Sequence, residues 1–77
     1  MLIINQHKDM LINLDNVVSL VREEMPELDK IQYWADTTTN DTILLGKYED
    51  TPEHENLIEK IAQAEGAVNV FYMPEED

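Results

Sequence analysis

The alternation of apolar and polar residues in this chain predicts an α+β domain, in which an antiparallel sheet of about five to six short strands carries one helix. Residues 30–37 alternate strictly, which is the period of a half-buried strand, and residues 10–14 do the same. A single helical repeat follows between residues 51 and 66. The expected order is therefore βββββαβ, with the strands in a meander and the helix packed on one face.

Six segments match the strand pattern and are separated by polar or proline-containing turns. They are residues 2–5, 10–14, 17–22, 30–37, 42–48 and 68–73. Asp15 and Asn16 both tolerate a left-handed backbone, so they are a candidate two-residue turn between the second and third strands. The acidic segment 23–29 is expected to be a loop, because Pro26 cannot donate to a strand ladder. The polar residues 38–41 turn the fourth strand into the fifth.

The helix is expected to begin at Thr51-Pro52 and to end at Gly66. Thr51 can cap the helix, Pro52 suits its first position, and the acids that follow favour the positive end of the helix dipole. Gly66 favours the left-handed conformation that ends many helices. The apolar residues at helical spacing are Leu57, Ile58, Ile61, Ala62 and Ala64. Residues 74–77 are expected to be a solvated acidic tail.

The size of the chain predicts one domain, residues 1–77, with a small core. A chain of 77 residues buries only about 60% of the surface that its unfolded form exposes. There is no cysteine, which excludes disulfides and thiolate metal sites. The chain shows no signal-peptide pattern, and no apolar stretch approaches the roughly 20 residues that span a bilayer. The sequence therefore predicts a cytoplasmic protein that does not enter a membrane.

The strongest compositional feature is a net charge of −12, and it is unevenly distributed. Residues 1–22 hold two acids and two bases, whereas residues 23–77 hold fifteen acids and three bases. Such a chain repels nucleic acid and anionic membranes and is attracted to basic protein surfaces. Three acidic clusters stand out, in residues 23–29, 49–55 and 75–77.

Catalytic and metal-binding patterns are missing from the sequence. His7 and His54 lack the spacing of a zinc site and are expected at the surface. The segment DTTTND, residues 36–41, lacks the glycine and glutamate of a calcium loop. Ser19 lies inside an expected strand without the glycines of a nucleophile elbow. We therefore expect no catalytic residue, no cofactor and no metal, and no enzymatic activity.

A protein-binding surface is the function class that remains. Tyr33 and Trp34 are neighbours in one strand and point to opposite faces, so Trp34 either lies under the helix or is exposed for binding. Tyr48 is expected in the core or at its rim, with exposure as a binding anchor as the alternative. The candidate binding residues are the acids of the first two clusters and these two aromatic residues: Glu23, Glu24, Glu27, Asp29, Trp34, Tyr48, Glu49, Asp50, Glu53 and Glu55.

Four short segments suggest a biological setting. INQHKD and INLDNV near the start, LGKY before the helix and FYMPEE at the end lie in an order that resembles a family of small uncharacterised proteins of phages and prophages of Firmicutes. The helix, TPEHENLIEKIAQAEG, departs from the charged, alanine-containing helix expected of such relatives. The resemblance implies a mobile element in a Gram-positive host and no established activity.

Two functional hypotheses follow. The first is a non-enzymatic, phage-type inhibitor that binds a host protein with a basic surface, such as a nucleic-acid-binding defence effector of the CRISPR type, by imitating DNA. The second is a phage accessory or regulatory module that self-associates as a homo-oligomer or binds another phage protein, because an apolar edge strand is a template for a further strand.

Overall fold

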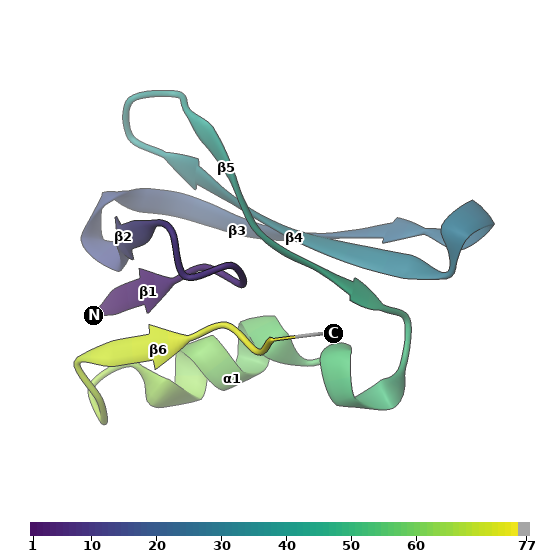
Figure 1. Cartoon of the computed structure of the whole chain (residues 1–77). Helices are drawn as coiled ribbons and strands as arrows, with labels where there is room; N and C mark the ends of the chain where they lie inside the picture. Colours follow the sequence, from purple (N-terminus) through teal and green to yellow (C-terminus); the bar gives the residue numbers. More distant parts are fainter. Residues whose placement is uncertain (76–77) are drawn as a thin grey trace.

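Two three-stranded sheets and one short helix make up residues 1–75, the part of the chain that this computed structural model describes (Figure 1). One sheet has the order β2-β1-β6 and the other the order β3-β4-β5. The elements are β1 Leu2–Ile4, β2 Leu11–Asn13, β3 Val17–Met25, β4 Lys30–Thr37, β5 Thr42–Glu49, α1 Leu57–Ala64 and β6 Val70–Tyr72. The α+β class and the element order are confirmed, but the single meander is matched only in part, because β3, β4 and β5 form a meander and the other strands form a second sheet.

The meander fails at the connection between β2 and β3. Asp15 and Asn16 do not form a hairpin turn, because residues Leu14–Asn16 form a 3₁₀ turn instead. The side-chain oxygen of Asn13 accepts a hydrogen bond from the Asp15 N–H at 3.0 Å and so caps this turn. The turn carries the chain from one sheet to the other. The small sheet is completed by β6, which pairs parallel with β1.

The acidic segment after residue 22 is not a loop throughout, which corrects a second expectation. Glu23–Met25 belong to β3, in register with residues 30–32 of β4. An edge strand can carry charged side chains because they extend into solvent. Only the 3₁₀ turn Pro26–Leu28 and Asp29, which has a left-handed φ of 53°, separate the two strands.

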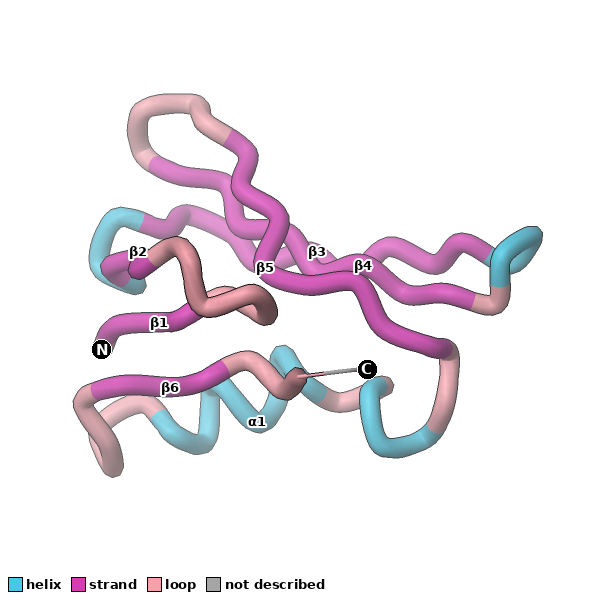
Figure 2. Tube along the Cα trace, viewed as in Figure 1, coloured by secondary structure: helices cyan, strands magenta, loops and turns pink. Residues whose placement is uncertain are grey.

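The helix begins later than expected. Pro52–His54 form a separate 3₁₀ turn, and α1 starts only at Leu57 (Figure 2). Thr51 precedes the 3₁₀ turn, but its side chain makes no capping hydrogen bond. Gly66 has a φ of 85° after the helix, so its predicted left-handed conformation is confirmed.

The core lies between the β3-β4-β5 sheet on one side and the small sheet with α1 on the other (Figure 1). Ile31, Tyr33 and Ala35 alternate along β4 and are fully buried, as their spacing predicts. The Tyr33 hydroxyl donates a hydrogen bond to the carbonyl of His54. The remaining buried apolar residues are Ile3, Ile12, Leu45, Tyr48, Leu57, Ile61 and Met73.

The outer edge of β5 is covered at Leu45 and Lys47 by one residue, Gln6. Its amide nitrogen donates to the Lys47 carbonyl at 2.8 Å, and its amide oxygen accepts from the Lys47 N–H at 2.8 Å. The Gln6 backbone N–H also donates to the Leu45 carbonyl at 2.8 Å. Gln6 therefore forms the hydrogen bonds that a neighbouring strand would form. The turn that carries it is held by Asn5, whose side-chain oxygen accepts from two backbone N–H groups.

Candidate protein-binding surface

The face of the β3-β4-β5 sheet that points away from the core has an apolar centre. Trp34 on β4 lies opposite Val21 on β3 and Leu44 on β5, so the three side chains form one row across the sheet. Val21 is 42% exposed, and Trp34 and Leu44 are half-buried. The small sheet and α1 both lie on the other side of this sheet (Figure 1). Trp34 therefore does not lie under the helix. The fold supports the other expected position, on the outer surface of the sheet.

Carboxylates flank this apolar row on both sides. The Trp34 indole N–H points to Glu23 at 3.3 Å. On the other side, the carboxylate of Asp36 accepts hydrogen bonds from the hydroxyls of Ser19 at 2.8 Å and Thr42 at 3.0 Å. A shallow hollow of about 270 Å³ lies over Trp34, between Glu23 and Asp36. An aromatic face between two carboxylates matches the chemistry of a lysine or arginine side chain.

Two of the three predicted acidic clusters meet at one end of the same sheet. The backbone N–H of Asp50 donates to the carbonyl of Asp29 at 2.9 Å, and Glu49 lies opposite Lys30 across β4 and β5. The 3₁₀ turns after β3 and after β5 place further acids at this end (Figure 1). We call it the acidic end, and its exposed carboxylates are Glu24, Glu27, Asp29, Glu49, Asp50, Glu53 and Glu55.

One base in this region is already paired. Arg22 donates to Glu24 at 2.7 Å, and this hydrogen bond raises the pKa of the guanidinium above its ordinary value. Residues 22–30 and 47–56 together carry eight acids and three bases. The acidic end therefore keeps a net negative charge after its own bases are counted.

Of the third cluster, the structure describes only Glu75. Glu75 forms an ion pair with Lys8 at 2.6 Å, which lowers the pKa of its carboxyl. The predicted tail positions Glu76 and Asp77 lie outside the described residues. The candidate surface is accordingly limited to the first two clusters and the outer face of the β3-β4-β5 sheet.

Tyr48 does not lie on this surface, because it takes the core position and not the exposed position given as its alternative. Its side chain is fully buried, its hydroxyl donates to the Pro74 carbonyl at 2.8 Å, and its ring lies 4.9 Å from that of His54. His54 is likewise buried rather than at the surface, and its Nδ1 lies 2.9 Å from the Glu49 carbonyl. His7 is exposed, as expected.

Sequence reasoning missed three residues of the outer face: Val21, Asp36 and Leu44. The alternation of β4 pairs Asp36 with Trp34 on one face and is a signal that could have found it. Leu44 is harder to assign to a sheet face from the sequence, because Ile43, Leu44 and Leu45 are consecutive and apolar. A bulge in β5 next to Trp34 turns Leu44 outward and Leu45 into the core.

The described residues contain no group of three or more histidine, cysteine, aspartate or glutamate side chains placed to hold a metal ion. Within residues 1–75, no helix is both long and apolar enough to cross a bilayer. No protein-family model, curated protein or solved structure matches this chain.

Proposed function

We propose that this chain is a non-enzymatic, phage-type protein that binds and inhibits a host protein through the partner's basic, nucleic-acid-binding surface. The observation that carries the proposal is the meeting of residues 23–29 and 49–55 at one end of the β3-β4-β5 sheet. Carboxylates that project from turns of a rigid sheet attract the same lysine and arginine side chains that bind phosphates.

The outer face of the β3-β4-β5 sheet provides an apolar and aromatic contact, which charge alone does not provide. Electrostatic attraction raises the association rate, but stable complexes also need a desolvated apolar or aromatic anchor. The row of Trp34, Val21 and Leu44 lies on the same sheet as the acidic end and is partly exposed. We expect Trp34 to be the anchor, with a basic side chain of the partner over its ring.

Charge reversal tests the proposal. A variant with Glu23→Lys and Glu27→Lys should bind a basic host partner at least about tenfold more weakly than the unchanged chain. Its binding should also depend less steeply on salt, because fewer charges pair across the interface. The measurement is affinity capture from a lysate of a Gram-positive host with and without competitor DNA, followed by titration of the captured protein at several salt concentrations.

The matched control is the variant Asp15→Lys with Glu59→Lys, which changes the net charge equally at exposed positions outside the surface. If both variants lose binding equally, net charge rather than this surface is responsible, and the proposal is wrong. A partner that competitor DNA does not displace excludes mimicry of nucleic acid. Recovery of the chain alone favours a self-associating accessory module instead.

A further inference from the structure

The β3-β4-β5 sheet has a second edge, and this one is open. β3 is an edge strand of nine residues, and within residues 1–75 the backbone of residues 18–25 is hydrogen-bonded to β4 alone. Unpaired N–H and C=O groups on an edge strand are a template for another strand. The first half of β3, residues 17–21, has the sequence VVSLV and lacks the charges that protect such edges.

The hydrogen bonds of Gln6 identify which backbone groups of β3 are unpaired. Because the Lys47 N–H donates to Gln6, Lys47 and its partner Gln32 form a non-hydrogen-bonded pair of β4 and β5. Gln32 must then bond to Glu23 on its other side, and bonded and non-bonded pairs alternate along the ladder. The outward N–H and C=O groups therefore belong to Leu20, Arg22 and Glu24.

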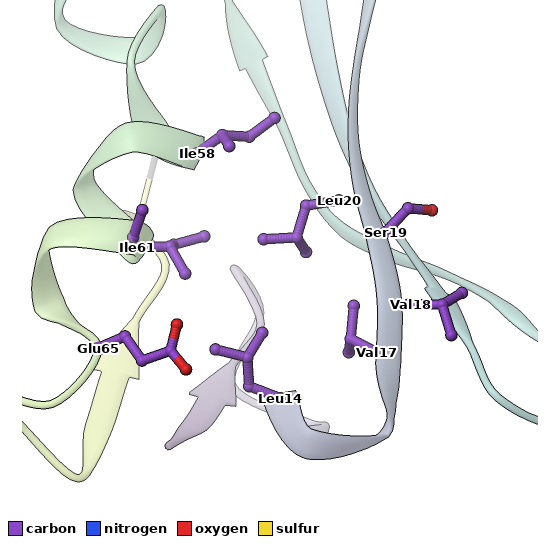
Figure 3. Close-up of a pocket in the computed structure, with 9 residues that line it drawn as sticks. Leu14, Val17, Val18, Ser19, Leu20, Ile58, Ile61 and Glu65 are labelled. Atoms are coloured by element: carbon purple, nitrogen blue, oxygen red, sulfur yellow. The ribbon is translucent and has the colours of Figure 1, made fainter.

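A groove runs along this edge between β3 and α1. Its volume is about 370 Å³, and its lining is apolar apart from Ser19 and Glu65. Leu20 from β3 and Ile61 from α1 point toward one another across it, as Figure 3 shows. Ile58 and Glu65 lie one helical turn to either side of Ile61 (Figure 3), and Ala62, next to Ile61, also lines the groove. The groove thus offers apolar surface directly beside unpaired backbone.

We propose that an extended segment of the basic partner adds to β3 as a fourth strand. Its backbone pairs with the outward groups of Leu20 and Arg22, and every second side chain enters the groove. The alternate side chains lie on the outer face, next to Val21 and Glu23, so this face selects basic residues there. The segment recognised is therefore one in which apolar and basic residues alternate. This inference rests on the proposed function and names the way in which the partner is recognised.

Charge complementarity favours such a segment over a second copy of this chain. Pairing two copies through β3 would bring together two molecules of net charge −12, which repel each other. A basic segment meets the same edge with attraction.

Amide hydrogen exchange measured by NMR tests strand addition directly. The probe is a synthetic ten-residue peptide that alternates valine and arginine, and the control peptide alternates valine and glutamate. In the free protein the amides of Leu20 and Arg22 should exchange fast and that of Glu23 slowly, because only Glu23 is bonded to β4. The arginine peptide should slow exchange at Leu20 and Arg22 by at least about tenfold. Binding without this protection would overturn the inference.

A pair of helix variants tests the groove. Ala62→Arg places a long cationic side chain at its mouth, whereas Gln63→Arg makes a comparable change at the next exposed helix position, which does not line the groove. Ala62→Arg should weaken binding of the arginine peptide at least about tenfold, and Gln63→Arg should change it less than about twofold. Equal effects of the two variants would overturn the inference.

The outcomes separate this inference from the proposed function. If Trp34→Ala abolishes binding of the basic peptide while Ala62→Arg leaves it intact, the outer face binds and strand addition is wrong. If neither the peptide nor a basic host protein binds, both proposals fail. If light scattering shows a dimer that Ala62→Arg disrupts, the occupant of the edge is a second copy and the inference fails.

Discussion

The two edges of the β3-β4-β5 sheet differ in whether their outward backbone groups have hydrogen-bond partners. At the β5 edge, the Gln6 side chain accepts and donates hydrogen bonds as a strand would, and the Lys47 backbone has no group left for another chain. At the β3 edge, the backbone of residues 18–25 has no such cover within residues 1–75. Gln6 thus covers the β5 edge at Leu45 and Lys47, with its backbone N–H and its side-chain amide. The small size of the domain therefore does not by itself explain why the β3 edge is open.

The closed edge also lies nearer the centre of the core. Gly46 on β5 is buried, and a Cβ atom added there would lie 2.5 Å from Tyr48 Cε2 and 2.6 Å from the Tyr48 hydroxyl. The Tyr48 ring cannot move freely, because its hydroxyl is bonded to Pro74 and its face contacts His54. The β5 edge is thus closed by hydrogen bonds on one side and by tight packing on the other.

The largest expected effect is that of Gly46→Ala. The added methyl group should force Tyr48 or the β5 backbone to shift and should lower the free energy of unfolding by about 3 kcal/mol. Urea denaturation, monitored by far-UV circular dichroism, measures this loss of unfolding free energy. Gly66→Ala is the control, since no atom lies within 4 Å of its Cβ position and only its φ of 85° opposes a side chain. Gly66→Ala should lower the free energy of unfolding by about 1 kcal/mol. An equal loss in both variants would show that Tyr48 does not constrain residue 46.

The next effect is that of Gln6→Ala, which should convert the closed edge into an open one. It leaves the Lys47 N–H and C=O without their partner and should cost about 2 kcal/mol of unfolding free energy. The Lys47 amide should also exchange with solvent faster than in the unchanged chain, because its N–H then lacks the Gln6 acceptor.

Gln32→Ala is the matched control for Gln6, because Gln32 is half-buried on the outer face of the same sheet. It should change the unfolding free energy by less than about 0.5 kcal/mol. Urea denaturation and amide hydrogen exchange compare the two variants. A Gln6→Ala protein that keeps both its stability and the slow exchange of the Lys47 amide would remove the distinction between the edges.

The sequence predicted the elements better than their pairing. Each expected strand exists, and Gly66 ends the helical region, because these features depend on neighbouring residues. The parallel pairing of β1 with β6 joins segments almost seventy residues apart in a chain of 77. No local pattern records that contact. The same holds for Gln6, whose partner is 41 residues away.

The candidate surface was predicted in part for a similar reason. The acids of residues 23–29 and 49–55 were found from charge, and their meeting at one end of the sheet follows from the hairpin register. The alternation of β4 places Trp34 on the face opposite Tyr33, as predicted. The faces of Leu44 and Tyr48 depend on the β5 bulge beside Trp34, and nothing in the run ILLG marks that bulge.

The smallest expected effect concerns the turn that holds Gln6 against β5. Lys8 lies in this turn, and its ion pair with Glu75 lowers the pKa of the Glu75 carboxyl below its ordinary value of 4.5. A lowered pKa in the folded state means that the unfolded chain binds the proton more readily. Any stabilisation is therefore present above pH 4.5 and is lost as the pH falls through the lowered value.

Glu75→Gln should leave the urea midpoint unchanged at pH 7, since both side chains are more than half exposed and the ordering of such pairs offsets their attraction. NMR titration of the Glu75 carboxyl in the wild type should still show the lowered pKa. A clear loss of stability at pH 7 that disappears at pH 3 would mean that the ion pair does hold the turn. The closure of the β5 edge would then depend on charge, whereas the bonds of Asn5 and Gln6 indicate that neutral amide groups are sufficient for it.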